Sequence, residues 1–219
     1  MLISLEGLPG AGKSTQGRLL QQRLSREGYR TAYLPDLATL ETDVLGDQLV
    51  EMFSFSGDPF MRHRDVLTES FLAAAIRANI VATRIDPAEG VHDVVIEDRG
   101  CHTMLSYSLA SLIRYHDADP AEGIRWLRSL LALTGRTAEV ALWLRPPVQV
   151  ALDRWAHREA KQPLPEQCAF LTSVDAAYQE LALGDDTLHT LEVGEQQSEH
   201  VHEQILATIR PFLPTPTNR

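Results

Sequence analysis

One eight-residue stretch near the start of the chain constrains the fold more than any other feature. It reads Gly7-Leu8-Pro9-Gly10-Ala11-Gly12-Lys13-Ser14 and satisfies the pattern G-x-x-x-x-G-K-[ST] at every fixed position. An apolar strand is expected at 2–5 and a helix at 14–27, so the stretch joins a strand to a helix. A glycine turn with a solvated lysine is the alternative. Chance produces such a match in roughly 1% of chains of this length, which favours a phosphate-binding loop.

The residue types in this loop are suited to binding a nucleoside triphosphate. Glycines let the backbone bend so that its N–H groups point at phosphate oxygens, and the helix N-terminus adds a partial positive charge. Lys13 supplies a full charge between the terminal phosphates, and the Ser14 hydroxyl suits a magnesium ion. The sequence therefore predicts binding of ATP and Mg²⁺ by Gly7, Gly10, Ala11, Gly12, Lys13, Ser14 and Thr15.

Strands and helices alternate along the rest of the chain. Short apolar runs predict four further strands, at 31–34, 94–96, 140–144 and 189–193. Helical spacing or capping signals predict helices at about 65–84, from Asp119 to Gly135, around Trp155, across 170–181 and across 201–209. This alternation implies an α/β fold with a mainly parallel sheet covered on both faces. We expect one domain over 1–213 and a loose tail at 214–219.

Composition narrows the classes of partner. The 219 residues carry a net charge of −10, which disfavours a protein dedicated to binding duplex nucleic acid but leaves room for a local basic pocket. Cys101 and Cys168 form neither a metal spacing nor a disulfide framework, so a reduced, cytoplasmic compartment is expected. There is no visible targeting segment, and the apolar cluster at 71–75 is too short to span a membrane. We therefore expect neither a nucleic acid nor a membrane as partner.

The third predicted strand ends in Glu97-Asp98-Arg99, at the sheet edge where ligands bind in open α/β folds. A carboxylate there can orient magnesium through water or accept a proton, which makes Asp98 a catalytic and metal-site candidate. Arg99 can hold an acceptor phosphate or balance the acidic pair, whereas the alternative is a surface turn. Asp36 follows the second strand and is a weaker substrate-binding candidate, since a turn-initiating Asp beside Pro35 explains it equally well.

Three further arginines are candidates for binding phosphate. Arg77 lies in an apolar helical stretch, where a charge needs an anionic partner, either a substrate phosphate or a nearby acidic residue. Arg154 and Arg158 are four residues apart, so both can point from one helix face toward the phosphate loop. In a mobile lid they could neutralise charge on a transferred phosphoryl group, and the alternative is a solvated basic face.

At this point the residues resemble a known family, the thymidylate kinases within the nucleoside-monophosphate kinases. The resemblance covers nearly the whole chain. It is carried by Gly12-Lys13-Ser14-Thr15-Gln16, Leu72-Ala73-Ala74-Ala75-Ile76-Arg77, Val95-Ile96-Glu97-Asp98-Arg99 with Leu105-Ser106-Tyr107, and Tyr178-Gln179-Glu180-Leu181-Ala182.

The resemblance implies a three-layer sandwich around a five-stranded parallel sheet of order 2-3-1-4-5, and a homodimer. Arg77 would then grip the phosphate of the acceptor, and Tyr107 would face its sugar. Asp98 and Arg99 would organise phosphate and magnesium, and a lid at about 154–168 would carry Arg154 and Arg158.

Three positions depart from the family pattern, all on the acceptor side. Pro9 stands where an acidic residue usually binds the sugar hydroxyl, Ala73 where an aromatic ring stacks on thymine, and Ser108 where a glutamine is common. Stacking and a buried hydrogen bond each contribute about 1–3 kcal/mol, so thymidylate recognition does not follow from the resemblance.

The sequence therefore predicts ATP- and magnesium-dependent phosphoryl transfer to a nucleoside monophosphate. A modified nucleotide or another small metabolite is the close runner-up as acceptor. Two hypotheses of a different class stay open at this point. One is a regulatory ATPase without a small acceptor, and the second is a phosphate-loop fold that has lost activity.

Overall fold

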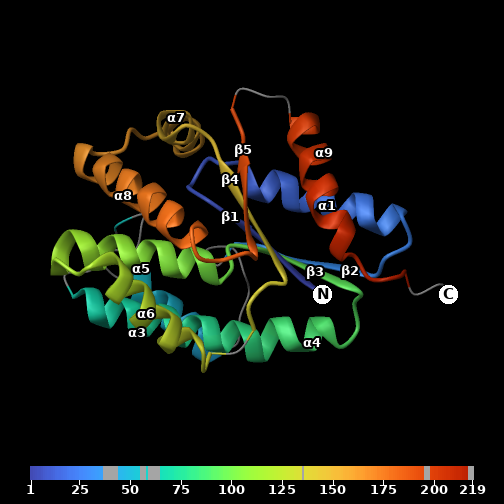
Figure 1. Ribbon diagram of the computed structural model, residues 1–219, viewed down its shortest axis with the longest axis horizontal. Helices are drawn as coiled ribbons and strands as arrows, with labels where there is room; N and C mark the ends of the chain where they lie inside the picture. The colour runs from blue at the N-terminus through green and yellow to red at the C-terminus, as the bar shows by residue number, and fades with distance from the viewer. Residues whose placement is uncertain (37–43, 55–57, 59–64, 135, 195–197, 217–219) are drawn as a thin grey trace.

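The computed structural model describes residues 1–36, 44–54, 58, 65–134, 136–194 and 198–216 (Figure 1). Five parallel strands form one sheet in the order β2-β3-β1-β4-β5, which confirms the expected α/β fold and strand order. The strands are β1 (Leu2–Glu6), β2 (Thr31–Leu34), β3 (Val94–Asp98), β4 (Val140–Arg145) and β5 (Leu188–Glu192). Leu5 of β1 lies opposite Asp98 of β3 and Leu142 of β4. This register brings the carboxyl ends of the three central strands to one edge.

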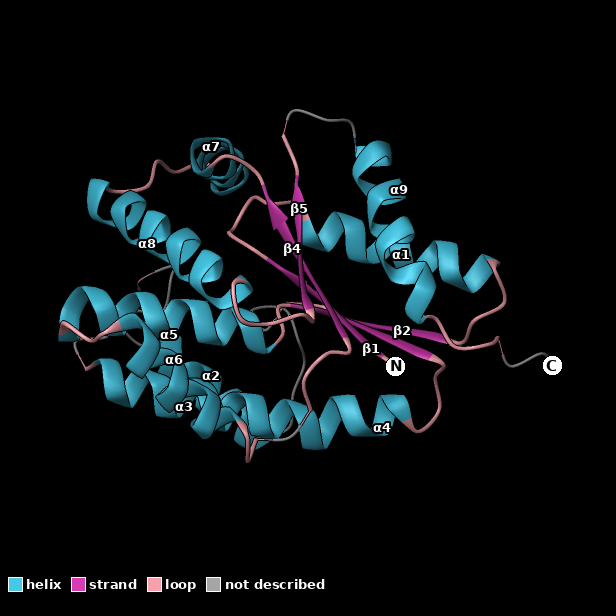
Figure 2. Cartoon of the chain, viewed as in Figure 1, coloured by secondary structure: helices cyan, strands magenta, loops and turns pink. Residues whose placement is uncertain are grey.

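Helices cover both faces of the sheet (Figure 2). Strands β1 and β3 are buried along their whole length, as parallel strands covered on two sides must be. The helices are α1 (Lys13–Arg26), α2 (Val44–Ser54), α3 (Val66–Ile80), α4 (Asp86–Glu89), α5 (Cys101–His116), α6 (Pro120–Leu131), α7 (Val148–Glu159), α8 (Pro165–Ala182) and α9 (Ser198–Ile209). Helices α1 and α9 pack on one face, and α3, α5 and α8 belong to the larger layer on the other.

Local signals predicted several helix ends correctly, while two helices were missed. The Asp119 side chain caps α6 by accepting from the Glu122 N–H at 3.0 Å, as its place before a proline indicates. The predicted end of this helix at Gly135 lies outside the described residues. Helix α2 was not predicted, nor was α5, whose apolar spacing is interrupted by several buried serines (Ser106, Ser108 and Ser111).

One helical stretch is longer than expected. Helix α3 continues through a π-helical turn, η2 (Val81–Ile85), into α4. By length and composition alone, the segment Val66–Glu89 could cross a membrane, which the sequence analysis did not anticipate. A core helix passes the same test. Here α3 packs along α5, and its buried Arg77 is paired with Glu97 of β3.

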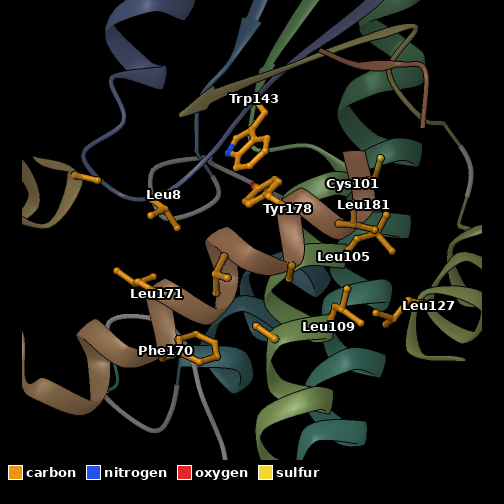
Figure 3. Packing of buried hydrophobic residues seen from close by; sticks show 14 of the residues in the cluster. Leu8, Cys101, Leu105, Leu109, Leu127, Trp143, Phe170, Leu171, Tyr178 and Leu181 are labelled. Atoms are coloured by element: carbon orange, nitrogen blue, oxygen red, sulfur yellow. The ribbon is translucent and has the colours of Figure 1, made fainter. Parts of the chain in front are cut away.

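The largest core cluster joins α5, α6, α7 and α8 to β4 (Figure 3). At its upper end Trp143 of β4 stacks on Tyr178 of α8, with ring centroids 5.1 Å apart and planes at 14°. Both side chains are buried. This packing carries the Tyr178 hydroxyl to the start of the phosphate loop, where it accepts a hydrogen bond from the Gly7 N–H at 3.1 Å.

Candidate active site

The phosphate loop is held tightly between β4 and α7. A Cβ atom on Gly10 would lie 2.1 Å from the carbonyl oxygen of Ala151, and one on Gly7 would lie 2.5 Å from that of Leu144. Both glycines also have positive φ angles, +83° and +127°. Other residues are therefore excluded by space and by backbone conformation alike. Ala11 is buried within the loop, Gly12 precedes α1, and Thr15 is exposed on the first turn of that helix.

Lys13 lies folded back into the loop. Its ammonium group donates to the carbonyl oxygens of Gly7, at 3.0 Å, and Leu8, at 2.9 Å, and the residue is 5% exposed. Burial, and next the nearby charge of Arg99, lower the pKa of Lys13 to about 7. A triphosphate in the loop would supply the negative charge that favours the protonated form.

Ser14 and Asp98 meet at the edge of the sheet, as the sequence analysis expected for a magnesium site. The Ser14 hydroxyl donates to Asp98 Oδ2 at 2.5 Å, and Tyr33 of β2 donates to the same oxygen at 3.2 Å. The other carboxylate oxygen, Oδ1, is buried without a partner in the described part of the chain.

This donor set fits Mg²⁺. Across the described ranges, no group of three or more His, Cys, Asp and Glu side chains gathers into a metal cage. Magnesium is usually held by one or two protein oxygens together with substrate phosphates and water, which a hydroxyl and an orphaned carboxylate oxygen can provide. Ser14 and Asp98 are therefore suitable to hold it.

A cavity of about 360 Å³ opens beside the loop. Helices α3, α5, α7 and α8 contribute to its walls, and Tyr107 and Arg99 line it together, with the guanidinium carbon 5.9 Å from the ring centroid. The Tyr107 hydroxyl is buried, and the described residues offer it no hydrogen bond. All three positions that depart from the family pattern also line this cavity, namely Pro9, Ala73 and Ser108.

Arg99 lines this cavity and has a strained backbone. Its φ angle is +73°, in the left-handed region that a residue other than glycine rarely adopts. The side chain donates from Nε to Asp36 at 2.7 Å and from Nη1 to the Gly7 carbonyl oxygen at 3.4 Å. The structure thus brings Asp36, Arg99 and the phosphate loop together, with Asp36 partly balancing the arginine.

Arg77 lines the same cavity, and its guanidinium is paired within the protein. Its Nη1 and Nη2 atoms donate to the two carboxylate oxygens of Glu97 at 2.5 and 3.2 Å, and Nη2 also donates to the Arg136 carbonyl oxygen at 2.9 Å. Of the two partners that the sequence left open, an acidic residue is the one observed. Because the pair is buried on both sides, it organises the wall between α3 and β3.

The two arginines of the expected lid both lie on α7, four residues apart, and they reach different neighbours. Arg154 donates from Nη2 to the Gly194 carbonyl oxygen at 3.2 Å, whereas Arg158 pairs with Glu159 and lines the cavity. Residues four apart on a helix are neighbours on one face, so the two long side chains start from the same side of α7. The span 154–168 comprises the end of α7, a loop and the start of α8.

A buried polar network behind the loop was missed by the sequence analysis. The Glu6 carboxylate, fully buried at the end of β1, accepts from the Gly100 N–H at 3.1 Å and from the Thr103 hydroxyl at 2.6 Å. His102 lies between Glu6 and Asp185, 3.7 and 3.2 Å away. Hydrogen bonds to these carboxylates overcome burial and raise the pKa of His102 well above its ordinary value, while the histidine lowers the pKa of Glu6 to about 2. A charged residue directly before the glycine loop was the available sequence signal.

A parallel sheet in the order 2-3-1-4-5, with a phosphate loop after β1, defines the P-loop NTPase fold, and here a cavity opens beside the loop. Sequence comparison identifies the family within this fold. The sequence model described as thymidylate kinase matches residues 5–205, and the chain belongs to the thymidylate kinase family.

Individual relatives agree with this assignment. A thymidylate kinase of Synechococcus sp. (strain JA-2-3B'a(2-13)) is 33% identical over 219 residues, covering 99% of this chain and 98% of its own. A probable thymidylate kinase of Thermococcus kodakarensis is 28% identical, covering 97% and 98% of the two chains. Among solved structures, thymidylate kinase from Ehrlichia chaffeensis matches with a TM-score of 0.65 at 18% identity, covering 96% of this chain and 98% of its own, which supports the fold.

Proposed function

We propose that this phosphotransferase moves the γ-phosphoryl group of ATP, with Mg²⁺, to a nucleoside monophosphate bound in the cavity. The observation that carries the proposal is the shared wall between the two sites. Arg99 lines the cavity and also reaches the carbonyl oxygen of Gly7 in the phosphate loop. A donor phosphate in the loop and an acceptor in the cavity would therefore meet at Arg99.

The chain's own residues divide the work of positioning and charge neutralisation. Lys13 and the loop amides would hold the β- and γ-phosphates, and Ser14 and Asp98 would hold the metal, which supplies charge neutralisation when bound. Arg99 would hold the acceptor and Tyr107 would face it. Arg158 would close over the reaction from α7, and Arg154 would act on the donor side near Gly194.

The acceptor itself is the open part of the proposal. Pro9 offers no side-chain acceptor for a sugar hydroxyl, and neither Ala73 nor Ser108 provides the base contact usual at its position, although all three line the cavity. This observation favours a modified nucleotide or a small metabolite of similar size as the second candidate.

We also propose that the protein is a cytoplasmic homodimer. One structural feature supports the homodimer, and another supports the cytoplasmic compartment. The α3 and α5 helices expose several large apolar side chains (Leu67, Phe71, Ile113 and Tyr115), which suit a partner of the same kind. Both cysteines carry free thiols, in agreement with a reduced compartment.

The test is ADP formation from MgATP with a panel of nucleoside monophosphates, nucleosides and small phosphorylated metabolites. Turnover that requires one member of the panel supports the proposal and identifies the acceptor. Turnover with thymidine monophosphate would show that other residues replace the three missing contacts. ATP hydrolysis that no acceptor stimulates would contradict the proposal and favour a regulatory ATPase.

A further inference from the structure

The hydroxyl of Tyr33 reaches the magnesium-site carboxylate from the edge of the sheet. Tyr33 lies on β2, next to β3, and its half-buried side chain crosses toward α1. Its hydroxyl donates to Asp98 Oδ2 at 3.2 Å, on the oxygen that also accepts from Ser14. The sequence analysis assigned no role to this tyrosine, and the phosphate-loop pattern does not include it.

A glycine inside α1 makes this approach possible. A Cβ atom on Gly17 would lie 2.4 Å from Cε2 of Tyr33 and 3.2 Å from Cδ1 of Leu5. Glycine is disfavoured in a helix interior relative to alanine, and the Gly17 backbone is ordinary helix, so a close approach is the reason for it. The Tyr33 ring thus occupies the space that a side chain at position 17 would fill.

The two donors orient the Asp98 carboxylate. With Ser14 and Tyr33 both on Oδ2, rotation of the carboxylate is restricted and Oδ1 is left buried with no partner among the described side chains. Burial and the charge of Asp98 raise the pKa of Tyr33 well above its ordinary value, so its hydroxyl keeps its proton and remains a donor. A hydrogen bond to an ionised group is stronger than one between neutral groups.

Resting on the function proposed above, we infer that Tyr33, seated against Gly17, is a positioning residue that holds Asp98 in the orientation required for the magnesium-bound nucleotide. It acts through Asp98 and does not itself need to touch ATP. Its removal should therefore weaken binding of the metal–nucleotide complex selectively, and leave binding of metal-free nucleotide unchanged.

The test is calorimetric titration with ATP in EDTA and with MgATP, on wild type and Tyr33→Phe, which retains the ring and removes the hydroxyl. We expect equal affinity for metal-free ATP and about ten- to a hundredfold weaker binding of MgATP, the range for one hydrogen bond to a charged group. The Mg²⁺ concentration for half-maximal turnover should rise by a similar factor. Tyr29→Phe, in the loop before β2, should behave as wild type.

A second variant tests the same contact from the side of α1. Gly17→Ala displaces the Tyr33 ring but retains its hydroxyl group, and we expect the same selective loss of affinity for MgATP. If Tyr33→Phe bound ATP and MgATP more weakly by the same factor, or bound both with wild-type affinity, the inference would be overturned. If wild type bound no nucleotide under either condition, the proposed function would fail with it, so the two failures are distinguishable.

Discussion

The donor and acceptor sides of the site differ in how their charged groups are satisfied. On the donor side, Lys13 donates to carbonyl oxygens of its own loop, and one buried oxygen of Asp98 has no partner in the described structure. On the acceptor side, Arg77 is paired with Glu97 and Arg99 with Asp36. The donor side is thus prepared for a highly charged ligand, whereas an acceptor phosphate must compete with carboxylates already present.

The difference shows which part of the site is free to change. The loop is constrained by backbone contacts that tolerate only glycine, so its chemistry is tied to its geometry. The cavity is built from side chains on several helices and can be altered one position at a time. Departures at Pro9, Ala73 and Ser108 alter the cavity while the loop pattern remains complete.

The largest expected effect comes from removing the lysine of the phosphate loop on the donor side. Lys13→Ala should lower kcat with the identified acceptor by about 10³-fold or more, because a preorganised charge on the transferring phosphates is lost. Arg26→Ala, at the exposed end of α1, is the matched control and should retain wild-type rates. Steady-state ADP formation measures both, and substantial turnover by Lys13→Ala would show that the loop does not hold the reacting phosphates.

The next effect breaks the ion pair in the cavity wall. Glu97→Gln retains the shape of the side chain but leaves Arg77 buried without a carboxylate, which should lower the free energy of unfolding by about 3 kcal/mol. Glu27→Gln, in the exposed pair with Arg23, should cost less than about 1 kcal/mol. Urea denaturation compares the two variants, and equal losses would show that burial of the pair is unimportant.

A third change sharpens the comparison by rebuilding the acceptor side. Ala73→Phe places a ring where the cavity has a methyl group, and should raise kcat/KM for thymidine monophosphate about tenfold, since stacking contributes about 1–3 kcal/mol. Ala75→Phe, on the exposed face of α3, should leave kcat/KM unchanged. A uniform fall for every acceptor with Ala73→Phe would instead mean that the ring blocks the cavity.

The smallest expected effect is the uptake of a proton by Lys13, on the donor side, when nucleotide binds. With a pKa of about 7 in the free protein, Lys13 is mostly neutral at pH 8.5, and a bound triphosphate should return its pKa toward the ordinary value above 10. MgATP binding should then take up close to one proton at pH 8.5 and close to none at pH 5.5.

Calorimetry in buffers of different ionisation enthalpy measures this uptake. Lys13→Arg should show almost none at either pH, because the guanidinium remains charged. Uptake in wild type that is the same at both pH values would contradict a lowered lysine pKa.

The sequence by itself determined the phosphate loop, the five strands and the placement of Asp98 at the carboxyl edge of the sheet. These features depend on local patterns: glycine spacing, short apolar runs and the common direction of parallel strands. Such patterns act over a few residues and therefore survive whatever packs around them.

Only the tertiary structure decided the partners of the charged side chains. Arg77 pairs with Glu97 on another element, and Arg154 reaches the Gly194 carbonyl oxygen. Tyr33 reaches Asp98 because Gly17 leaves space for its ring. Helix α5 likewise forms from a serine-interrupted sequence because burial against α3 and α8 stabilises it. The physical reason is that ion pairs and close approaches depend on distances between elements, and those distances are set by packing of the whole core.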